Sequence, residues 1–172
     1  MQHTFVVYME DKPGVLARVA ILVRRCQFNV ETITAGHTGQ PGVTRMTIVV
    51  EADEHGAHRI ESTLYKLVNV LLVENVTADC VSRDLALIKV SASAAQQPAL
   101  REVVERYRAE TIETGGNAVI IEATGSETKI DELVRALEPF GVLEMVRSGR
   151  IAMAKSTSAE IHLPGNPAHA VA

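Results

Sequence analysis

Apolar residues recur along the chain with two different periods, and the change from one period to the other marks the predicted elements. Between Phe28 and Ala35, apolar side chains at 28, 30 and 33 alternate with polar ones, which predicts a half-buried strand. From Pro13 to Cys26 the apolar positions lie three or four residues apart, which predicts a helix. These periods predict the order βαββαβ for the first half of the chain, with elements at residues 4–9, 13–26, 28–35, 44–50, 57–67 and 70–80.

The second half of the chain repeats this order. The pattern again predicts βαββαβ, with elements at residues 85–90, 100–107, 110–114, 118–123, 130–137 and 142–147. Ser126 or Thr128 is the predicted cap of the last helix, and one more strand is predicted at 150–154. The predicted fold class is therefore α+β, with two tandem ferredoxin-like βαββαβ domains at 1–80 and 81–155. Residues 156–172 have two prolines and little periodicity, so we expect a mobile tail there.

Composition and charge narrow the possible partners. Hydrophobic residues make up 47% of the chain and aromatic residues only 3%, so the core must be aliphatic. The net charge is −4, and residues 1–80, with 7 basic and 9 acidic side chains, share it evenly with the rest. An acidic chain argues against nucleic acid or an anionic membrane as a partner. We expect a cytoplasmic protein, because the sequence begins with no secretory signal and no apolar run approaches the ~18 residues of a membrane span.

The known signatures of catalytic and metal sites are missing. The sequence contains no G-x-S-x-G, no phosphate-binding G-x-x-x-x-G-K-[ST] and no G-x-G-x-x-G after a strand. His55 and His58 are the only closely spaced histidines, and further metal ligands are absent nearby. We therefore predict no catalytic residue, metal or cofactor in this chain. A ferredoxin-like RNA-binding module would need aromatics on its central strands, but residues 44–50 contain none. An acylphosphatase would need a phosphate-binding loop with arginine, and residues 11–14 do not supply one.

The first strand–loop–helix segment is the best candidate for a binding site. Gly14 removes a side chain where a helix begins, and free N–H groups at that point can receive a carboxylate. Asp11 can accept from an ammonium, and apolar residues follow at Val15 and Leu16. An aliphatic amino acid would fit these groups. The alternative is that Gly14 serves only the turn and Asp11 only caps the helix or complements its dipole.

This segment resembles the opening of an ACT domain. The residues are Glu-Asp-Lys-Pro-Gly-Val-Leu-Ala-Arg-Val at 10–19 and Phe-Asn-Val-Glu-Thr-Ile at 28–33. The similarity is closest to the small subunits of acetohydroxyacid (acetolactate) synthase. It continues in order through Arg-Met-Thr-Ile at 45–48, Leu-Val-Asn-Val at 67–70, Arg-Asp-Leu-Ala-Leu-Ile-Lys-Val at 83–90, Leu-Glu-Pro-Phe-Gly at 137–141 and Val-Arg-Ser-Gly at 146–149.

The resemblance implies a non-catalytic regulatory subunit. Such a subunit activates a separate catalytic subunit, which uses thiamine diphosphate, magnesium and FAD, and confers feedback inhibition by a branched-chain amino acid, usually valine. The effector pocket would lie between the ACT domains of a homodimer. The residues implied in it are Asp11, Gly14 and Asn29, with Val15, Leu16, Val30 and Ile33 as neighbours.

An ACT-domain amino-acid sensor that regulates a different enzyme is the alternative function. Gln27 stands where relatives often carry the glycine that ends the first helix, and a left-handed residue other than glycine costs about 1 kcal/mol there.

Overall fold

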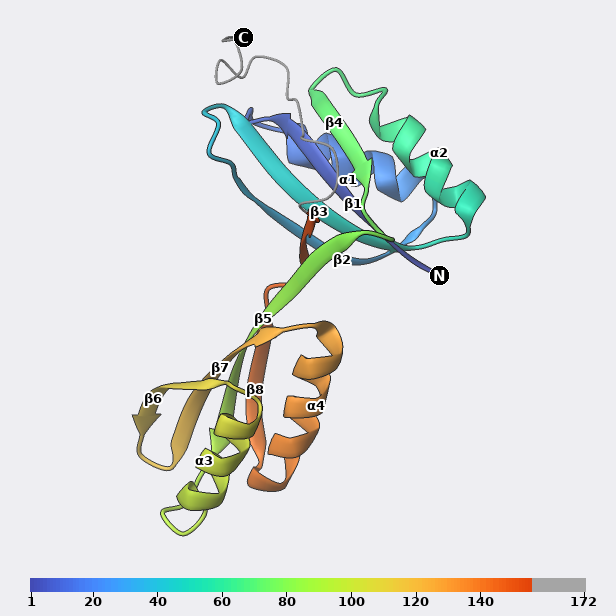
Figure 1. Cartoon of the computed structure of the whole chain (residues 1–172). Coiled ribbons are helices and arrows are strands. Elements are labelled where there is room, and N and C mark those ends of the chain that lie inside the picture. Colours follow the sequence, from blue (N-terminus) through green and yellow to red (C-terminus); the bar gives the residue numbers. More distant parts are fainter. Residues whose placement is uncertain (156–172) are drawn as a thin grey trace. The chain divides into compact units, whose positions relative to one another are not determined.

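The computed structural model describes residues 1–155 and divides them into two compact units (Figure 1). The first unit holds residues 1–81 and the segment that begins at Arg150, and the second holds residues 82–149. The prediction for the tail at 156–172 lies outside the described residues. No helix within residues 1–155 is long and apolar enough to cross a membrane.

The first unit has the predicted order βαββαβ. Its elements are β1 (Gln2–Glu10), α1 (Val15–Arg25), β2 (Asn29–His37), β3 (Val43–Glu51), α2 (Glu54–Leu64) and β4 (Val70–Asn75). The four strands form an antiparallel sheet in the order β2-β3-β1-β4, so β1 and β3 are central and β2 is an edge. The last predicted strand is shorter than expected, because it ends at Asn75 and a new strand begins only at Cys80.

Both helices of this unit cover one face of its sheet. Every second residue of β1, from Phe5 through Val7 to Met9, is fully buried against the apolar sides of α1 and α2. Two of the helix residues in this core are Val19 and Ile60, which are 0% and 1% exposed. The apolar side chains at the predicted helix and strand positions therefore pack together in a single core.

The opposite face of this sheet is covered by the chain itself. β9 (Ile151–Ala154) pairs with the start of β5 (Cys80–Ser91), and its Ala152 packs with Val6 and Tyr8 of β1. Arg45 fixes this strand, since its guanidinium donates to the Ala152 carbonyl and to the Tyr8 hydroxyl. The strand predicted at 150–154 is present and pairs with β5 of the second sheet, but its residues pack with the compact unit of residues 1–81.

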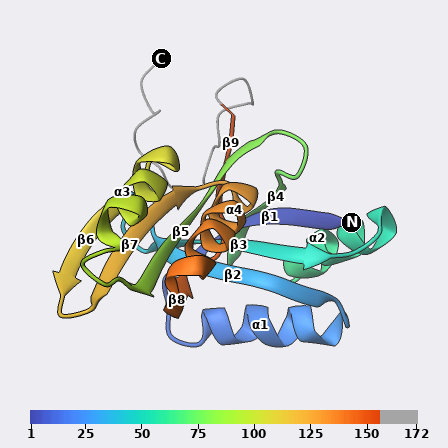
Figure 2. The same cartoon turned by 90° about the horizontal axis from the view of Figure 1, so that it is seen from below.

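The second unit repeats the arrangement. It contains most of β5, followed by α3 (Gln97–Arg106), β6 (Glu110–Gly115), β7 (Ala118–Gly125), α4 (Glu127–Leu137), a 3-10 turn (Glu138–Phe140) and β8 (Val142–Arg147). Its strands follow the order β6-β7-β5-β8, and α3 and α4 lie on the same face (Figure 2). Ser126 caps α4 by accepting from the Lys129 N–H, as predicted.

Gln27 does occupy the left-handed region, with φ of 60° directly after α1. The equivalent position after α3 in the second unit, Arg108, has φ of 50°. The first helix of each unit thus ends in the left-handed conformation that glycine normally adopts there, but with a side chain present.

Candidate functional site

The loop between β1 and α1 forms a short turn that is held at both ends. The Asp11 N–H donates to the Gly42 carbonyl of the β2–β3 turn at 2.8 Å, and the Val15 N–H donates to the Lys12 carbonyl at 3.2 Å. Gly14 is the N-cap of α1, with φ of 82°, and no side chain caps the helix. The alternative in which Asp11 caps α1 is therefore excluded, and the helix begins at Val15 rather than at Pro13.

A hollow of about 340 Å³ opens beside this turn. It is lined by residues 9–16 and by Thr44 of β3. A Cβ built on Gly14 would meet no atom within 4 Å, so this glycine faces open space. Val15 is buried at its edge, whereas Leu16 is 47% exposed. Four of the predicted site residues, Asp11, Gly14, Val15 and Leu16, therefore line one cavity.

The first turn of α1 offers this hollow hydrogen-bond donors. The first N–H groups of any helix lack partners within the helix. Here the Val15 N–H is bound to Lys12, and the Arg18 N–H is bound to Gly14. The amides of Leu16 and Ala17 have no backbone partner among the described residues, so they can bind an anion, which the helix dipole also favours.

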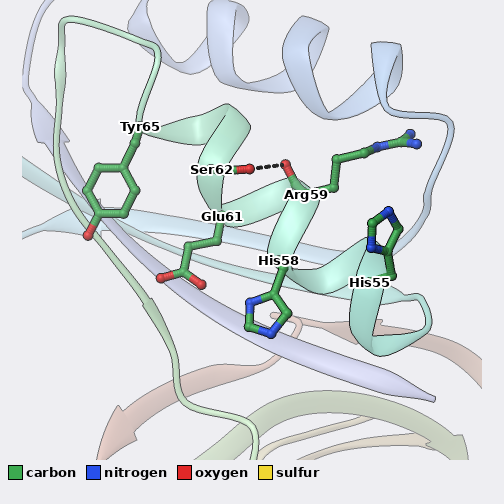
Figure 3. Close-up of a pocket in the computed structure, with 6 residues that line it drawn as sticks. All are labelled: His55, His58, Arg59, Glu61, Ser62 and Tyr65. Atoms are coloured by element: carbon green, nitrogen blue, oxygen red, sulfur yellow. Dashed lines mark hydrogen bonds between the residues drawn. The ribbon is translucent and has the colours of Figure 1, made fainter.

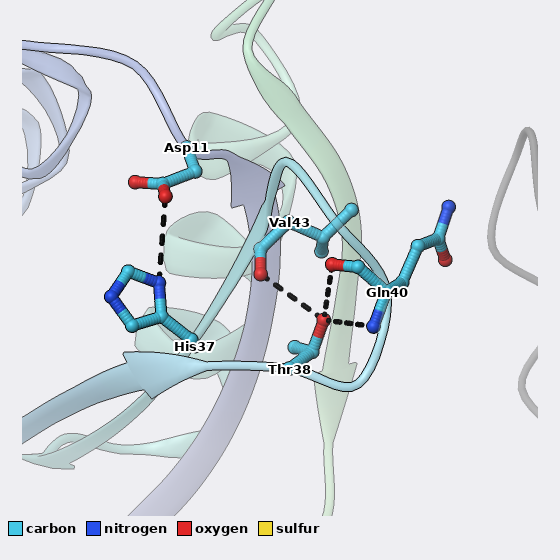
Figure 4. A network of polar contacts seen from close by, with 5 residues as sticks. All are labelled: Asp11, His37, Thr38, Gln40 and Val43. Atoms are coloured by element: carbon cyan, nitrogen blue, oxygen red, sulfur yellow. Dashed lines mark hydrogen bonds and ion pairs between the residues drawn. The ribbon is translucent and has the colours of Figure 1, made fainter.

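The Asp11 carboxylate lies close to a histidine of the neighbouring strand (Figure 4). Its Oδ2 is 3.4 Å from His37 Nδ1, a contact that is an ion pair when the imidazole is protonated. Both side chains are largely exposed. The adjoining turn is rigid, because the Thr38 hydroxyl accepts from the Gln40 N–H and lies 3.1 Å from the Val43 carbonyl. Asp11 therefore stands at the border of the hollow, where it can receive a cation.

A second polar cluster lies at the end of β1. Lys12 Nζ is 3.0 Å from Glu10, and Asn69 bridges Glu10 and Arg18, donating to the first and accepting from the second. Hydrogen bonds from Asn69 and Lys12 hold the pKa of the Glu10 carboxyl below its ordinary value. The sequence reasoning missed Glu10, Lys12 and Thr44 as lining residues. The first two belong to the quoted motif, but Thr44 reaches the site only through its register with Met9.

The other three predicted residues lie elsewhere in this unit. Asn29 begins β2 opposite Glu51, whereas Asp11 follows Glu10, which lies opposite Val43 at the other end of β3. Eight residues of strand separate these ends, or about 26 Å at ~3.3 Å per residue. Val30 and Ile33 pair with Val50 and Ile48, which lie seven and five residues along β3 from Val43, and neither lines the hollow. One chain therefore does not bring Asn29, Val30 or Ile33 into the hollow.

A larger but shallower hollow, about 510 Å³, lies on the exposed side of α2 (Figure 3). His55 and His58 project from it beside Glu61, all from the same helix. Within residues 1–155, no group of three or more histidine, cysteine, aspartate or glutamate side chains is placed to hold a metal ion. With no opposing wall, this surface offers a ligand few convergent groups.

Both halves of the chain match models of known protein families. A family model described as an AHAS small subunit-like ACT domain matches residues 5–72, and one for the small subunit of acetolactate synthase matches residues 83–156. The acetolactate synthase small subunit of Mycobacterium leprae is 45% identical over 154 residues, covering 89% of this chain and 91% of that protein. A probable small subunit from Archaeoglobus fulgidus is 38% identical over 90% of this chain and 98% of its own.

A solved structure agrees with these matches. The crystal structure of the acetolactate synthase small subunit from Thermotoga maritima superposes with a TM-score of 0.84 at 34% identity, covering 90% of this chain and 98% of that one. The ACT fold of the first unit and the double βαββαβ architecture are thereby confirmed. The chain belongs to the acetolactate synthase small-subunit family, whose members are the non-catalytic, regulatory subunits of that enzyme.

Proposed function

We propose that the chain binds a branched-chain amino acid, with valine as the expected effector, in the hollow beside the β1–α1 turn. The observation that carries this proposal is the side-chain-free, left-handed Gly14 facing an open cavity at the start of α1. The effector carboxylate would accept from the amides of Leu16 and Ala17, and its ammonium would contact Asp11. The aliphatic side chain would then lie against Val15 and Leu16.

A second copy of the chain would complete this site. The edge strand β2 has no partner on its outer side among the described residues, and its Ile33 is 44% exposed. Leu16 of α1 is similarly exposed. An unpaired strand edge with exposed apolar residues favours association with another strand. A homodimer formed along β2 would let the partner's β2 supply Asn29, Val30 and Ile33 to a hollow that they do not reach within one chain.

The regulatory output would act on a separate acetolactate synthase catalytic subunit, raising its turnover and making it sensitive to the effector. Thiamine diphosphate, magnesium and FAD would be bound by that partner. The alternative, an ACT-domain sensor of a different enzyme, is disfavoured because the similarity to acetolactate synthase small subunits extends through both halves. Co-purification with candidate catalytic subunits, with and without valine, distinguishes the two.

The role of Asp11 is tested by comparing valine with isovalerate, which lacks the amino group. We expect Asp11→Ala to weaken valine binding roughly 10- to 100-fold, since a hydrogen bond to a charged group contributes about 1.5–3 kcal/mol. Isovalerate should bind wild type far more weakly than valine does, and the variant should discriminate between them much less. His37→Ala is the matched control, because it removes the histidine beside Asp11 and leaves the carboxylate. Additive losses in calorimetry would show that Asp11 does not hold the ammonium.

Mixed dimers test whether the site is shared between copies. In a heterodimer of Asp11→Ala and Asn29→Ala chains, a shared site leaves one pocket with both changes and one with neither. Calorimetry should then find one site of wild-type affinity for each heterodimer. If Asp11 and Asn29 acted in the same chain, both pockets would be damaged and no wild-type site would remain.

A further inference from the structure

The sheet of the second unit has one face with no cover within that unit. Its core face carries Ala86, Ile88 and Val90 against α3 and α4. Strand alternation places Leu85 and Leu87 of β5 on the opposite face. They are 37% and 36% exposed, which is high for leucines on a central strand.

The neighbouring strands extend this apolar area. The register aligns Val146 of β8 with Leu87, and Ile120 of β7 with Lys89. Val146 is 57% exposed and Ile120 is half-buried. Four apolar side chains on three adjacent strands thus share one face of the sheet, which we call the open face; they are Leu85, Leu87, Ile120 and Val146. Contiguous apolar surface of this kind marks an interaction site.

The first unit shows how the same fold closes the equivalent face. There Val6 and Tyr8 are 0% and 9% exposed, because Ala152 of β9 and neighbouring residues pack over that side of the sheet. Among the residues described, the second unit has no strand that does the same for its own sheet. The open face is therefore a site at which the cover must come from outside the unit.

Charges around the open face are unevenly distributed. Glu122 lies beside Leu87 on β7, and Glu110 lies opposite Glu122 on the edge strand β6. Glu113 aligns with Ile120 on the same edge. On the other side, Lys89 lies opposite Glu144 and offsets its charge. The β6–β7 side is therefore acidic, whereas the β5–β8 side has no net charge and carries Leu85, Leu87 and Val146.

This asymmetry disfavours a second copy as the occupant. Two such faces related by a two-fold axis along the strands would bury the glutamates of one copy against the leucines of the other. With the axis across the strands, glutamates would meet glutamates. Burying an unpaired carboxylate or opposing like charges is costly, so the face fits a partner with an apolar centre and lysines or arginines on one side.

We propose that the open face docks on the catalytic subunit, and this inference rests on the proposed function, under which the chain acts on such a partner. Leu85, Leu87 and Val146 would insert into an apolar area of that subunit, and Glu110, Glu113 and Glu122 would pair with its basic residues. Apolar contacts at the centre would give most of the affinity, and the acidic side would add orientation and salt dependence.

The test measures binding of the full-length chain to the purified catalytic subunit over a range of salt concentrations. We expect Leu87→Asp to weaken binding at least about tenfold, as for a residue at the centre of an interface. Glu113→Lys should weaken binding by a smaller factor and reduce its salt dependence. The matched controls are Val68→Asp, at a position 95% exposed in the first unit, and Glu105→Lys, on an exposed position of α3; both should bind as wild type does.

Three readouts separate the possible failures. Circular dichroism reports folding, and if Leu87→Asp is unfolded, Glu113→Lys, at an exposed position of β6, decides the matter. Wild-type affinity in both variants would overturn the assignment of the open face. Loss of self-association in Leu87→Asp, with binding to the catalytic subunit intact, would assign the face to a second copy. If wild type binds no catalytic subunit, the proposed function itself fails, whereas valine binding by the isolated chain tests the effector site separately.

Discussion

Replacing Gly14 by alanine separates the two roles that this residue has in the structure. Its φ of 82° lies in the left-handed region, where a Cβ costs about 1–2 kcal/mol. No atom lies within 4 Å of that Cβ, so crowding within the protein adds nothing to this cost. The methyl group would instead occupy the hollow beside the amides of Leu16 and Ala17. If the effector carboxylate binds there, losing one charged hydrogen bond weakens valine binding about 10- to 150-fold.

Gly116 provides a matched control. It has φ of 57° in the turn between β6 and β7, and a Cβ there would also meet no atom within 4 Å. Gly14→Ala and Gly116→Ala should therefore lower the free energy of unfolding by similar amounts, measured with urea and circular dichroism. Calorimetry with valine should distinguish them, because only Gly14→Ala alters the hollow. Feedback inhibition of the reconstituted enzyme should follow the same order.

The two glycine variants would also show whether the effector is placed wrongly. If Gly14→Ala loses stability as Gly116→Ala does and yet binds valine with wild-type affinity, the effector does not lie against the start of α1. If both variants lose valine binding equally, the effect is a general loss of structure. Gly14→Asp adds a carboxylate that would repel that of the effector, so it should be more defective than Gly14→Ala.

Three further predictions concern stability. Gln27→Gly should raise the free energy of unfolding by about 0.5–1 kcal/mol, as relief of the left-handed strain exceeds the entropy lost by glycine; an unchanged urea midpoint would contradict this. Arg45→Ala should destabilise the first unit by about 2 kcal/mol and speed proteolysis near β9, because its charged hydrogen bonds hold that strand; equal digestion of wild type and variant would count against it. The lowered pKa of Glu10 means that its contribution to stability is present above the ordinary value of 4.5 and lost as pH falls through the lowered folded value. The difference in unfolding free energy between wild type and Glu10→Gln should therefore shrink on acidification, and a difference independent of pH would exclude Glu10 as its source.

The sequence was sufficient for the elements that depend on local pattern. Apolar periodicity alone separates helix from strand in both halves, and Ser126 was recognisable as a cap because a hydroxyl before a helix serves one common purpose. Gln27 was singled out because relatives often carry glycine at this point, and the structure shows the left-handed φ. These features depend on residues close together in the chain, so a linear reading is enough to find them.

The features that were missed depend on residues far apart in sequence. The strand at 151–154 pairs with β5 and also packs on the first unit, where Arg45 bonds to Ala152, 107 residues away in sequence; its local pattern shows neither partner. Thr44 lines the hollow only because β1 and β3 pair in a particular register. Capping of α1 was the alternative role for Asp11, but its backbone is bound to Gly42 and its carboxylate faces His37. Neither contact has a signal in the local pattern.

The position of Asn29 carries the strongest consequence for function. A family motif groups Asp11, Gly14 and Asn29 as if they shared one pocket, but strand register in one chain separates Asn29 from the other two by about 26 Å. No rearrangement of a loop closes that gap, because both ends are fixed in the same sheet. If all three residues bind one effector, the site must combine two chains. Effector binding would then stabilise the dimer by mass action, since only the dimer offers the whole site. Valine should therefore shift the monomer–dimer equilibrium toward the dimer in sedimentation experiments, and a dimer constant that does not change with valine would mean that one chain binds the effector alone.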